Sequence, residues 1–423
     1  MRILVVGGGG REHAICWKLN NESNVEKIYC APGNAGISNV AECIDIGDSD
    51  IENLLKFAKE NQIDLTIVGP EIPLVAGIVD AFEKEGLKIF GPNKKCAQLE
   101  GSKSFSKDFM IRHNLPTAKY KEYTDLDEAI SEIDSFGYPV VIKADGLAAG
   151  KGVVIPENRE DAITTLKEMM SDKKFGKAGD KIVVEEFLNG IETSILAFVD
   201  NDTIVPMVSS KDHKKVFEGE AGLNTGGMGT FSPSPFYTEE VDEFCQKYVY
   251  QKTVDAMAAE GREFKGIIFF GLMLTQDGPK VLEYNARFGD PEAQVVLPRM
   301  KNDLIEVIEA CIDGTLDQIN LEFEDNAAVC VVLASDGYPL AYEKGLPITG
   351  LEEFKKHEGY YCFHAGTKFN GDQIVTNGGR VLGVTAKGAT LKEARANAYA
   401  ATEWVKFDNK YMRHDIGKAI DEA

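Results

Sequence analysis

The first hundred residues alternate short apolar runs with longer segments of mixed polarity. The apolar runs are rich in β-branched residues, which is typical of buried strands. They are Ile3–Val6, Lys27–Cys30, Cys43–Ile46, Leu65–Val68 and Lys88–Phe90. A helix-length segment separates most of them, and this alternation predicts parallel βαβ units.

Glycine-bearing turns follow four of these runs. They are Gly7–Gly10, Ala31–Asn34, Gly69–Glu71 and Gly91–Asn93. In a parallel sheet the carboxyl ends of the strands meet at one edge, where ligand crevices form. The sequence therefore predicts a binding edge in the first domain.

The pattern changes after the first domain, and four units are predicted. A βαβ domain (1–102) precedes a linker helix with a small α+β lid (103–190), a central domain (191–325) and a strand-rich C-terminal α+β domain (326–423). Within them we expect helices near 161–171, 239–260, 304–311 and 391–406. The fold class is therefore mixed α/β and α+β, with a parallel sheet at the N-terminus.

Two glycine-rich stretches fail the nucleotide-binding fingerprints that they suggest. After Gly7–Gly10, Glu12 and His13 stand where the dinucleotide motif requires a small residue. Three residues instead of four separate Gly146 from Gly150, and a glycine follows Lys151, so Walker A also fails. The amides at the first turn remain compatible with a phosphate site, and equally with a tight turn that binds nothing.

A lysine lies at the end of the apolar run Val140–Lys143. Burying an ammonium group is costly unless an anion meets it. We therefore favour a functional anion partner for Lys143 over a surface position, and we interpret the glycines at 146–152 as a flap over phosphates.

A hairpin is predicted at 271–284, because Asp277-Gly278 separates two apolar runs. Strand alternation places Glu283, Asn285 and Arg287 on one face, and Leu282 with Tyr284 and Ala286 on the other. Carboxylate and amide oxygens suit Mg²⁺, and a guanidinium suits a phosphoryl or carboxylate group. The alternative is a solvated hairpin face with a charge pair.

Net charge and cysteine spacing exclude several classes of function. Lysine and arginine number 46 against 68 acidic residues, a formal charge of −22, so we expect no nucleic-acid or membrane partner. The eight cysteines show no C-x-x-C pair, which disfavours structural zinc and favours free thiols. With no apolar stretch long enough for a signal peptide, we expect a cytoplasmic protein.

Many longer motifs occur in the order found in one enzyme family. They are V-V-G-G-G-G-R-E-H-A, A-P-G-N-A-G, V-G-P-E-x-P-L-V-A-G-I-V-D, L-E-G-S-K-x-F-x-K-x-F-M, V-I-K-A-D-G-L-A-A-G-K-G-V, N-T-G-G-M-G and E-Y-N-A-R-F-G-D-P-E. Through them essentially the whole chain resembles the glycinamide ribonucleotide synthetases, or phosphoribosylamine-glycine ligases, of the ATP-grasp superfamily. It departs from the family at Glu218-Gly219-Glu220, where aspartates are usual, and at Leu223, where proline is common.

The resemblance implies an ATP-grasp fold with a Rossmann-like N-terminal domain, and ATP bound between the lid and the central domain. Lysine side chains would contact the phosphates of ATP. Backbone groups of residues 185–188, between the lid and the central domain, would contact the adenine, and an acidic side chain would contact the ribose. The implied nucleotide contacts are Lys103, Lys143, Gly150, Gly152, Glu185, Leu188 and Glu192. Glu283 and Asn285 are the implied ligands of Mg²⁺ or Mn²⁺.

The resemblance also implies the reaction, in which ATP drives the joining of glycine to 5-phosphoribosylamine through a glycyl phosphate in purine biosynthesis. Of the implied catalytic residues, Arg287 would hold the transferring phosphate or the glycine carboxylate, Asp212 the glycine ammonium, and Lys143 the ATP phosphates. The implied substrate contacts are Gly9, Gly10, Asn34, Glu71, Asp212, Gly227, Arg287, Asp290 and Glu292. We expect only small-molecule partners and a monomer or weak homodimer.

His213 has two interpretations, a general base for the incoming amine or a positioned loop histidine. For the whole chain, the nearest rival is an ATP-grasp ligase that carboxylates or formylates a ribonucleotide. More distant rivals are a nucleotide sensor without activity and a nicotinamide oxidoreductase, which the failed fingerprint weakens.

Overall fold

The N-terminal domain is built on a parallel five-stranded sheet with the order β3-β2-β1-β4-β5. The computed structural model describes residues 1–146 and 152–422. The strands are β1 (Arg2–Gly7), β2 (Lys27–Pro32), β3 (Glu42–Cys43), β4 (Leu65–Val68) and β5 (Ile89–Phe90). Each of the five overlaps one of the apolar runs, although β3 does so at Cys43 alone, and the predicted parallel sheet is confirmed.

Helices cover both faces of this sheet. They are α1 (Gly10–Asn20), α2 (Ile51–Glu60), α3 (Glu71–Ala76), α4 (Ile78–Lys84) and α5 (Lys94–Gly101). Helix α1 packs on one face, while α2 and α4 pack on the other. The strand order reverses between β1 and β4, so the loops that follow these two strands flank the crevice where such sheets bind ligands.

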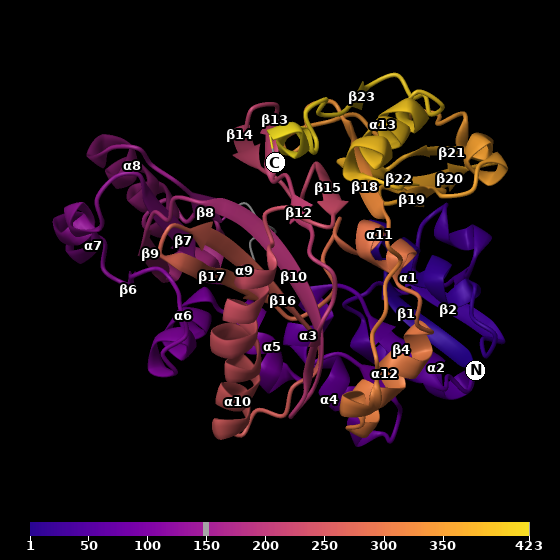
Figure 1. Ribbon diagram of the computed structural model, residues 1–423, viewed down its shortest axis with the longest axis horizontal. Helices are drawn as coiled ribbons and strands as arrows, with labels where there is room; N and C mark the ends of the chain where they lie inside the picture. Colours follow the sequence, from indigo (N-terminus) through magenta and orange to yellow (C-terminus); the bar gives the residue numbers. More distant parts are fainter. Residues whose placement is uncertain (147–151, 423) are drawn as a thin grey trace.

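A smaller antiparallel sheet, with the order β6-β9-β7-β8, forms the lid at the opposite end of the molecule (Figure 1). Its strands are β6 (Tyr120–Tyr123), β7 (Val140–Ala144), β8 (Val153–Val154) and β9 (Ile182–Glu186). Helices α7 (Leu126–Glu132) and α8 (Arg159–Met170) pack against Ile142 and its neighbours, so Lys143 lies on the other face of β7. Helix α6 (Lys103–Arg112) leads into the lid.

The central sheet lies between the lid and the N-terminal domain (Figure 1). Its antiparallel strands, in the order β11-β10-β16-β17, are β10 (Ile191–Asp200), β11 (Ile204–Pro206), β16 (Lys265–Thr275) and β17 (Gly278–Asn285). Helices α9 (Glu239–Cys245) and α10 (Gln251–Ala259) cover one face. The N-terminal domain and α12 (Leu304–Asp313) cover the other, so the sheet is buried on both sides.

The C-terminal sheet recruits two strands from the central segment of the chain. Its path is β12-β15-β18-β22-β19, and β23 pairs with β18. The strands are β12 (Lys211–Asp212), β15 (Gly229–Ser232), β18 (Ala327–Ser335), β19 (Tyr360–His364), β22 (Arg380–Gly388) and β23 (Lys410–Tyr411). Helix α13 (Leu391–Thr402) packs on this sheet.

Two small hairpins lie outside the main sheets. They are β13 (Lys215–Phe217) with β14 (Ala221–Asn224), and β20 (Thr367–Asn370) with β21 (Gln373–Thr376). The eight cysteines are free thiols, as expected. None of the helices in the described residues combines the length and apolar character needed to span a membrane.

Candidate active site

A buried cluster of lysines and one acid joins α6 to the lid. The Lys143 Nζ lies 2.7 Å from Glu185 Oε1, and the Lys107 Nζ lies 2.8 Å from Glu185 Oε2. Although burial opposes ionisation, these two ammonium groups hold the pKa of Glu185 below its usual value. The apolar surroundings of Lys143 required an anion, and that anion is Glu185.

Lys103 lies one helical turn before Lys107 on α6. Its Nζ donates to the Gly146 carbonyl at 3.0 Å, and burial lowers the pKa of Lys103. Burial lowers the pKa of Lys107 to about 8. Three ammonium groups therefore lie close together where α6 meets the lid, an arrangement suited to a polyphosphate.

The predicted hairpin β16–β17 is present, but it carries a bulge that changes one predicted face. Gly271 is opposite Glu283 while Leu272 is opposite Val281, so Leu282 is the extra residue. Val281 takes the inward place in the helix-covered core with Tyr284. The prediction that Leu282 shares this face is wrong.

The displaced Leu282 joins a small apolar cluster where the lid meets the central sheet. Its partners are Ala118, Leu188 and Met273, all of which are largely buried. The apolar surface of this cluster is chemically suited to a flat base. Glu192, at the start of β10, lies across the sheet from Met273, close to this cluster.

Glu283 lies between the lysines of the lid and α6 on one side and Lys214 on the other. The Lys214 Nζ lies 3.2 Å from Glu283 Oε1. Lys214 first, and then Lys143 and Lys103, hold the pKa of Glu283 down to about 2, so this carboxylate is ionised at neutral pH. With Asn285 two residues later, the hairpin presents two hard oxygen donors.

This donor pair fits Mg²⁺ only if other ligands complete the shell. No cluster of three or more acidic, histidine or cysteine side chains in residues 1–146 and 152–422 could hold a metal ion. Mg²⁺ characteristically takes one or two protein oxygens together with water and substrate phosphates. The ionised Glu283 and the Asn285 amide meet that requirement.

Arg287 connects the hairpin to the N-terminal domain. Its Nη2 lies 2.8 Å from Glu100 Oε1, and its Nε lies 3.5 Å from Glu71 Oε2. Arg287 and Arg11 both donate to the Phe288 carbonyl, at 3.2 and 3.1 Å. The structure therefore brings two of the predicted substrate residues, Glu71 and Arg287, into contact.

Two buried acids lie beyond Lys214. Asp212 is 7 % exposed and Glu292 is 3 % exposed. Burial raises the pKa of Asp212 despite the nearby Lys214, and burial together with Asp212 raises the pKa of Glu292 to about 8. A pair of buried acids whose pKa values are raised is well suited to receive an ammonium group or amine.

The first glycine turn approaches the loop that contains Asp290 and Glu292. A Cβ added to Gly9 would lie 3.2 Å from Asp290 Oδ2, and one added to Gly10 would lie 2.5 Å from Gln294 Nε2. A side chain at either position would have to displace the Asp290 carboxylate or the Gln294 amide. The predicted contacts Gly9, Gly10 and Asp290 therefore lie side by side.

Arg380, from β22, ties this loop to the N-T-G-G-M-G segment. Its Nη1 lies 3.3 Å from Asp290 Oδ1 and donates to the Gly226 carbonyl at 2.9 Å. Gly227 has φ +120°, and a Cβ there would lie 2.5 Å from the Pro291 ring. The N-T-G-G-M-G and E-Y-N-A-R-F-G-D-P-E motifs therefore meet at Asp290 and Pro291, beside the glycine turn of the first motif.

Family models match three consecutive parts of the chain. The phosphoribosylglycinamide synthetase N domain matches residues 1–100, its ATP-grasp (A) domain 101–293 and its C domain 328–419. The chain belongs to the phosphoribosylglycinamide synthetase family. The resemblance drawn from the sequence motifs is therefore confirmed.

Individual relatives agree with this family assignment over their full lengths. The phosphoribosylamine-glycine ligase of Halalkalibacterium halodurans is 51% identical over 423 residues, which is 100% of this chain and 98% of the relative. The crystal structure of phosphoribosylamine-glycine ligase from Thermotoga maritima is 34% identical, with a TM-score of 0.85, and the match covers 98% of this chain and 100% of that one.

A more distant structure shares the ATP-grasp fold. The biotin carboxylase of Campylobacter jejuni, solved as a β,γ-ATP complex, is 14% identical with a TM-score of 0.73, covering 97% of this chain and 92% of that one. At this identity the likeness concerns the fold alone.

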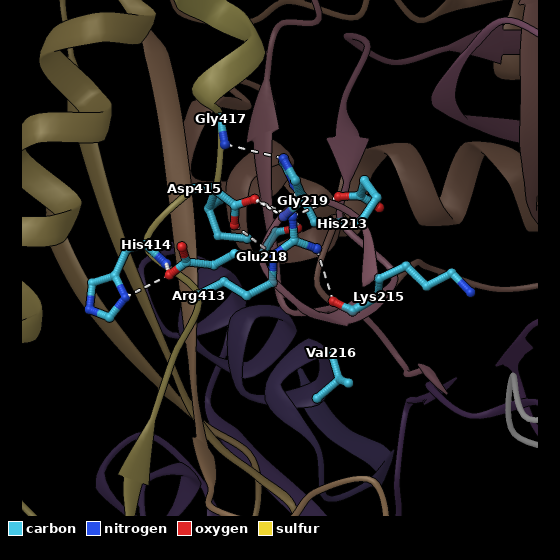
Figure 2. Close-up of polar contacts among 12 residues, drawn as sticks. His213, Lys215, Val216, Glu218, Gly219, Arg413, His414, Asp415 and Gly417 are labelled. Carbon is cyan, nitrogen blue, oxygen red and sulfur yellow. Dashed lines mark hydrogen bonds and ion pairs between the residues drawn. The ribbon is translucent and has the colours of Figure 1, made fainter. Parts of the chain in front are cut away.

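His213 is a positioned histidine in this member of the synthetase family. Its Nε2 accepts a hydrogen bond from the Gly417 amide at 3.2 Å (Figure 2), and its Nδ1 faces the Gly229 carbonyl at 3.3 Å. Burial lowers the pKa of His213 to about 3. Because backbone groups occupy both ring nitrogens, the structure favours the positioned loop histidine over the general base.

Three further predicted contacts are Asn34, Gly150 and Gly152, of which the structure describes Asn34 and Gly152. Asn34 donates to the carbonyls of Gly8 and His364, at 2.9 and 2.8 Å, and so joins the first turn to the C-terminal domain. Gly150 lies outside the described residues, whereas Gly152 is described and accepts from the Ala144 amide at 2.9 Å.

Sequence reasoning missed several charged groups of the site. They are Lys107, Lys214, Glu100 and Arg380. A signal existed for Lys107, since it follows Lys103 by four residues and therefore shares its helix face. Lys214 follows two residues after Asp212, on the same side of an extended chain. Glu100 and Arg380 contact their partners only through the fold.

Proposed function

We propose that this chain is an ATP-dependent ligase that joins glycine to 5-phosphoribosylamine, giving glycinamide ribonucleotide, ADP and phosphate in purine biosynthesis. The observation that carries this proposal is the position of Lys214. Its ammonium contacts Glu283 on the phosphate side of the site and contributes to the field around Asp212 on the acid side. A phosphate-binding half and an ammonium-binding half are therefore adjacent.

The first step activates glycine at its carboxylate. A carboxylate oxygen attacks the γ-phosphorus, the bond to the β,γ-bridging oxygen breaks, and ADP leaves. Such a transfer depends on positioning and charge neutralisation. Lys103 and Lys143 supply positive charge, and Lys143 exchanges its bond to Glu185 for one to the nucleotide.

Lys107 lowers the free-energy cost of this exchange. When Lys143 turns to a phosphate, Glu185 would be left as a buried carboxylate without a cation, which is strongly unfavourable. Lys107, 2.8 Å from the other oxygen of Glu185, remains as its partner.

Glu283 and Asn285 would hold a divalent ion, and the ion would supply charge neutralisation for the nucleotide phosphates. The hairpin itself fixes the Glu283 and Asn285 side chains in place. Strand β17 pairs with β16 along one edge, and the apolar face of β17 is buried under α9 and α10.

The second step forms the amide. The nitrogen of 5-phosphoribosylamine attacks the acyl carbon, phosphate leaves with the former carboxylate oxygen, and the proton that the nitrogen loses passes to the departing phosphate. Asp212 and Glu292 would hold the glycine ammonium and face the incoming amine. The loops after β1 and β4, with Gly9, Gly10 and Glu71, would receive the phosphoribosyl group at the crevice of the parallel sheet.

The test is identification of the product made from glycine, ATP and freshly prepared 5-phosphoribosylamine. We expect ADP release that requires glycine and ignores bicarbonate and formate, together with glycinamide ribonucleotide by mass spectrometry. ADP release that follows bicarbonate or formate would favour the rival carboxylating or formylating ligase, and ATP binding without turnover would favour a sensor.

A further inference from the structure

The hairpin β13–β14 begins and ends at groups of the candidate active site. Lys214 directly precedes β13, and Thr225 directly follows β14. The Thr225 amide and hydroxyl both donate to the Lys214 carbonyl, at 2.8 Å each, which closes the base of the hairpin. Any displacement of the hairpin is therefore transmitted to Lys214.

The hairpin has little support of its own. It is an isolated two-stranded sheet with an irregular register, and Phe217 and Leu223 are 54 % and 51 % exposed. A lone two-stranded hairpin in water is marginally stable at best. Something outside it must fix its position.

The C-terminal segment supplies that support (Figure 2). Arg413, only 1 % exposed, donates from Nη1 to the Lys215 carbonyl at 2.9 Å and from Nη2 to Glu220 Oε1 at 2.7 Å. Its Nε donates to Asp415 Oδ1 at 2.7 Å, and Asp415 Oδ2 accepts from the Gly219 amide at 2.8 Å. We call Arg413 and Asp415 the C-terminal clamp.

The clamp holds the hairpin at its base and at its turn. Lys215 is the residue immediately after Lys214, while Gly219 and Glu220 form the turn between the two strands. A guanidinium has a planar fork of donors, so it fixes direction as well as distance. A buried arginine whose acceptors lie on two segments about 200 residues apart is well placed to fix one segment against the other.

We propose that the C-terminal clamp positions Lys214, so that Arg413 is a positioning residue for the reaction although it touches neither substrate. This inference rests on the proposed function only in its kinetic test, which measures the proposed activity. The Lys214 ammonium reaches Glu283 only while the peptide between Lys214 and Lys215 stays in place, and Arg413 holds that peptide through its neighbouring carbonyl.

The test is a double-mutant cycle between Arg413→Ala and Lys214→Ala. Misplacement of an active-site group by about 1 Å can lower the rate about a hundredfold, so we expect Arg413→Ala to lower kcat/KM for glycine by roughly tenfold to a hundredfold. On the Lys214→Ala background the same change should have little further effect, because both variants remove one interaction. A purely structural role would give multiplicative losses.

His414→Ala is the matched control. His414 lies between the two clamp residues, and its ring is exposed and bonds only the exposed Glu218 side chain at 2.9 Å in the described contacts. We expect its kcat/KM to stay within about twofold of the wild type. Should Arg413→Ala fail to fold, Glu220→Ala breaks the clamp from the exposed side of the hairpin, and the same cycle applies.

A readout independent of activity separates this proposal from the proposed function. Amide hydrogen exchange over 215–224 should become faster in Arg413→Ala, with exchange in β16–β17 unchanged. Multiplicative losses in the cycle, or kcat/KM and hairpin exchange equal to the wild type, would overturn the clamp. Wild-type protein that shows no glycine-dependent ADP release would overturn the proposed function instead.

Discussion

Two hairpins bring charged groups to the same site, and they are stabilised in different ways. Hairpin β16–β17 lies inside the central sheet, with helices on one side and the N-terminal domain on the other. Hairpin β13–β14 is mostly exposed, and side chains from the C-terminus hold it. Glu283 on the first hairpin contacts Lys214 at the base of the second.

The difference shows two ways of fixing a functional group. A donor in a packed sheet is held by backbone pairing and buried apolar neighbours, so neither Glu283 nor Asn285 needs a dedicated support. A donor at the base of an exposed hairpin needs distant side chains to fix it, and those side chains become part of the site without touching a ligand.

The largest expected effect comes from the packed hairpin. Glu283→Ala removes one of two hard oxygen donors and the partner of Lys214, while the fold keeps its core. We expect kcat/KM for ATP to fall about a thousandfold, the order found when a main electrostatic group is removed. ADP release measures it, with the exposed Glu240→Ala on α9 as control, and activity within tenfold of the wild type would contradict the role of Glu283.

An intermediate effect is expected at Lys107, which neither hairpin carries. Lys107→Met leaves Glu185 with Lys143 alone, so Lys143 must abandon a buried carboxylate to reach a phosphate. We expect KM for ATP to rise roughly tenfold, with KM for glycine unchanged, since breaking a buried pair is strongly unfavourable. Steady-state kinetics measure this, and the exposed Lys94→Met is the control. An equal rise in KM for ATP and KM for glycine would contradict a specific role of Lys107 in nucleotide binding.

The smallest expected effect is a pH-dependent change in stability, which distinguishes Glu283 on the phosphate side of the site from Glu292 on the acid side. The folded pKa of Glu283 is about 2, so its stabilisation is present above its ordinary value of 4.5 and is lost as the pH falls through 2. The folded pKa of Glu292 is about 8, so its contribution is present below 4.5 and is lost as the pH rises through 8.

Glu292→Gln should therefore match the wild type in Tm near pH 5 and exceed it at pH 9. For a chain of this length a Tm difference of roughly 1 °C is expected for each kcal/mol of stabilisation. Thermal unfolding in the absence of substrates measures it. Equal Tm differences at pH 5 and pH 9 would show that Glu292 does not titrate in this range.

The sequence allowed the packed parts of the molecule to be predicted better than the clamped parts. Apolar runs and the Asp277-Gly278 turn are local signals, and they led to the parallel sheet and to hairpin β16–β17. The bulge at Leu282 changes one face of that hairpin, and strict alternation cannot reveal such a bulge.

The contacts that support the site were harder to foresee. Arg413 bonds Lys215 across 198 positions, and Arg380 bonds Gly226 across 154. No periodicity or spacing connects residues so far apart, and only the folded chain brings them together. The sequence motifs identified most of the groups proposed to touch substrates, but few of the groups that hold them.

The most direct test of the proposed chemistry follows the oxygen atoms of glycine. Glycine labelled with ¹⁸O in its carboxylate is incubated with the wild-type protein, ATP and 5-phosphoribosylamine, and the released phosphate is analysed by mass spectrometry. Attack of the carboxylate on the γ-phosphorus predicts one ¹⁸O atom in each phosphate released. Unlabelled phosphate, formed together with ADP and the amide product, would contradict the glycyl phosphate and with it the joint use of the two hairpins.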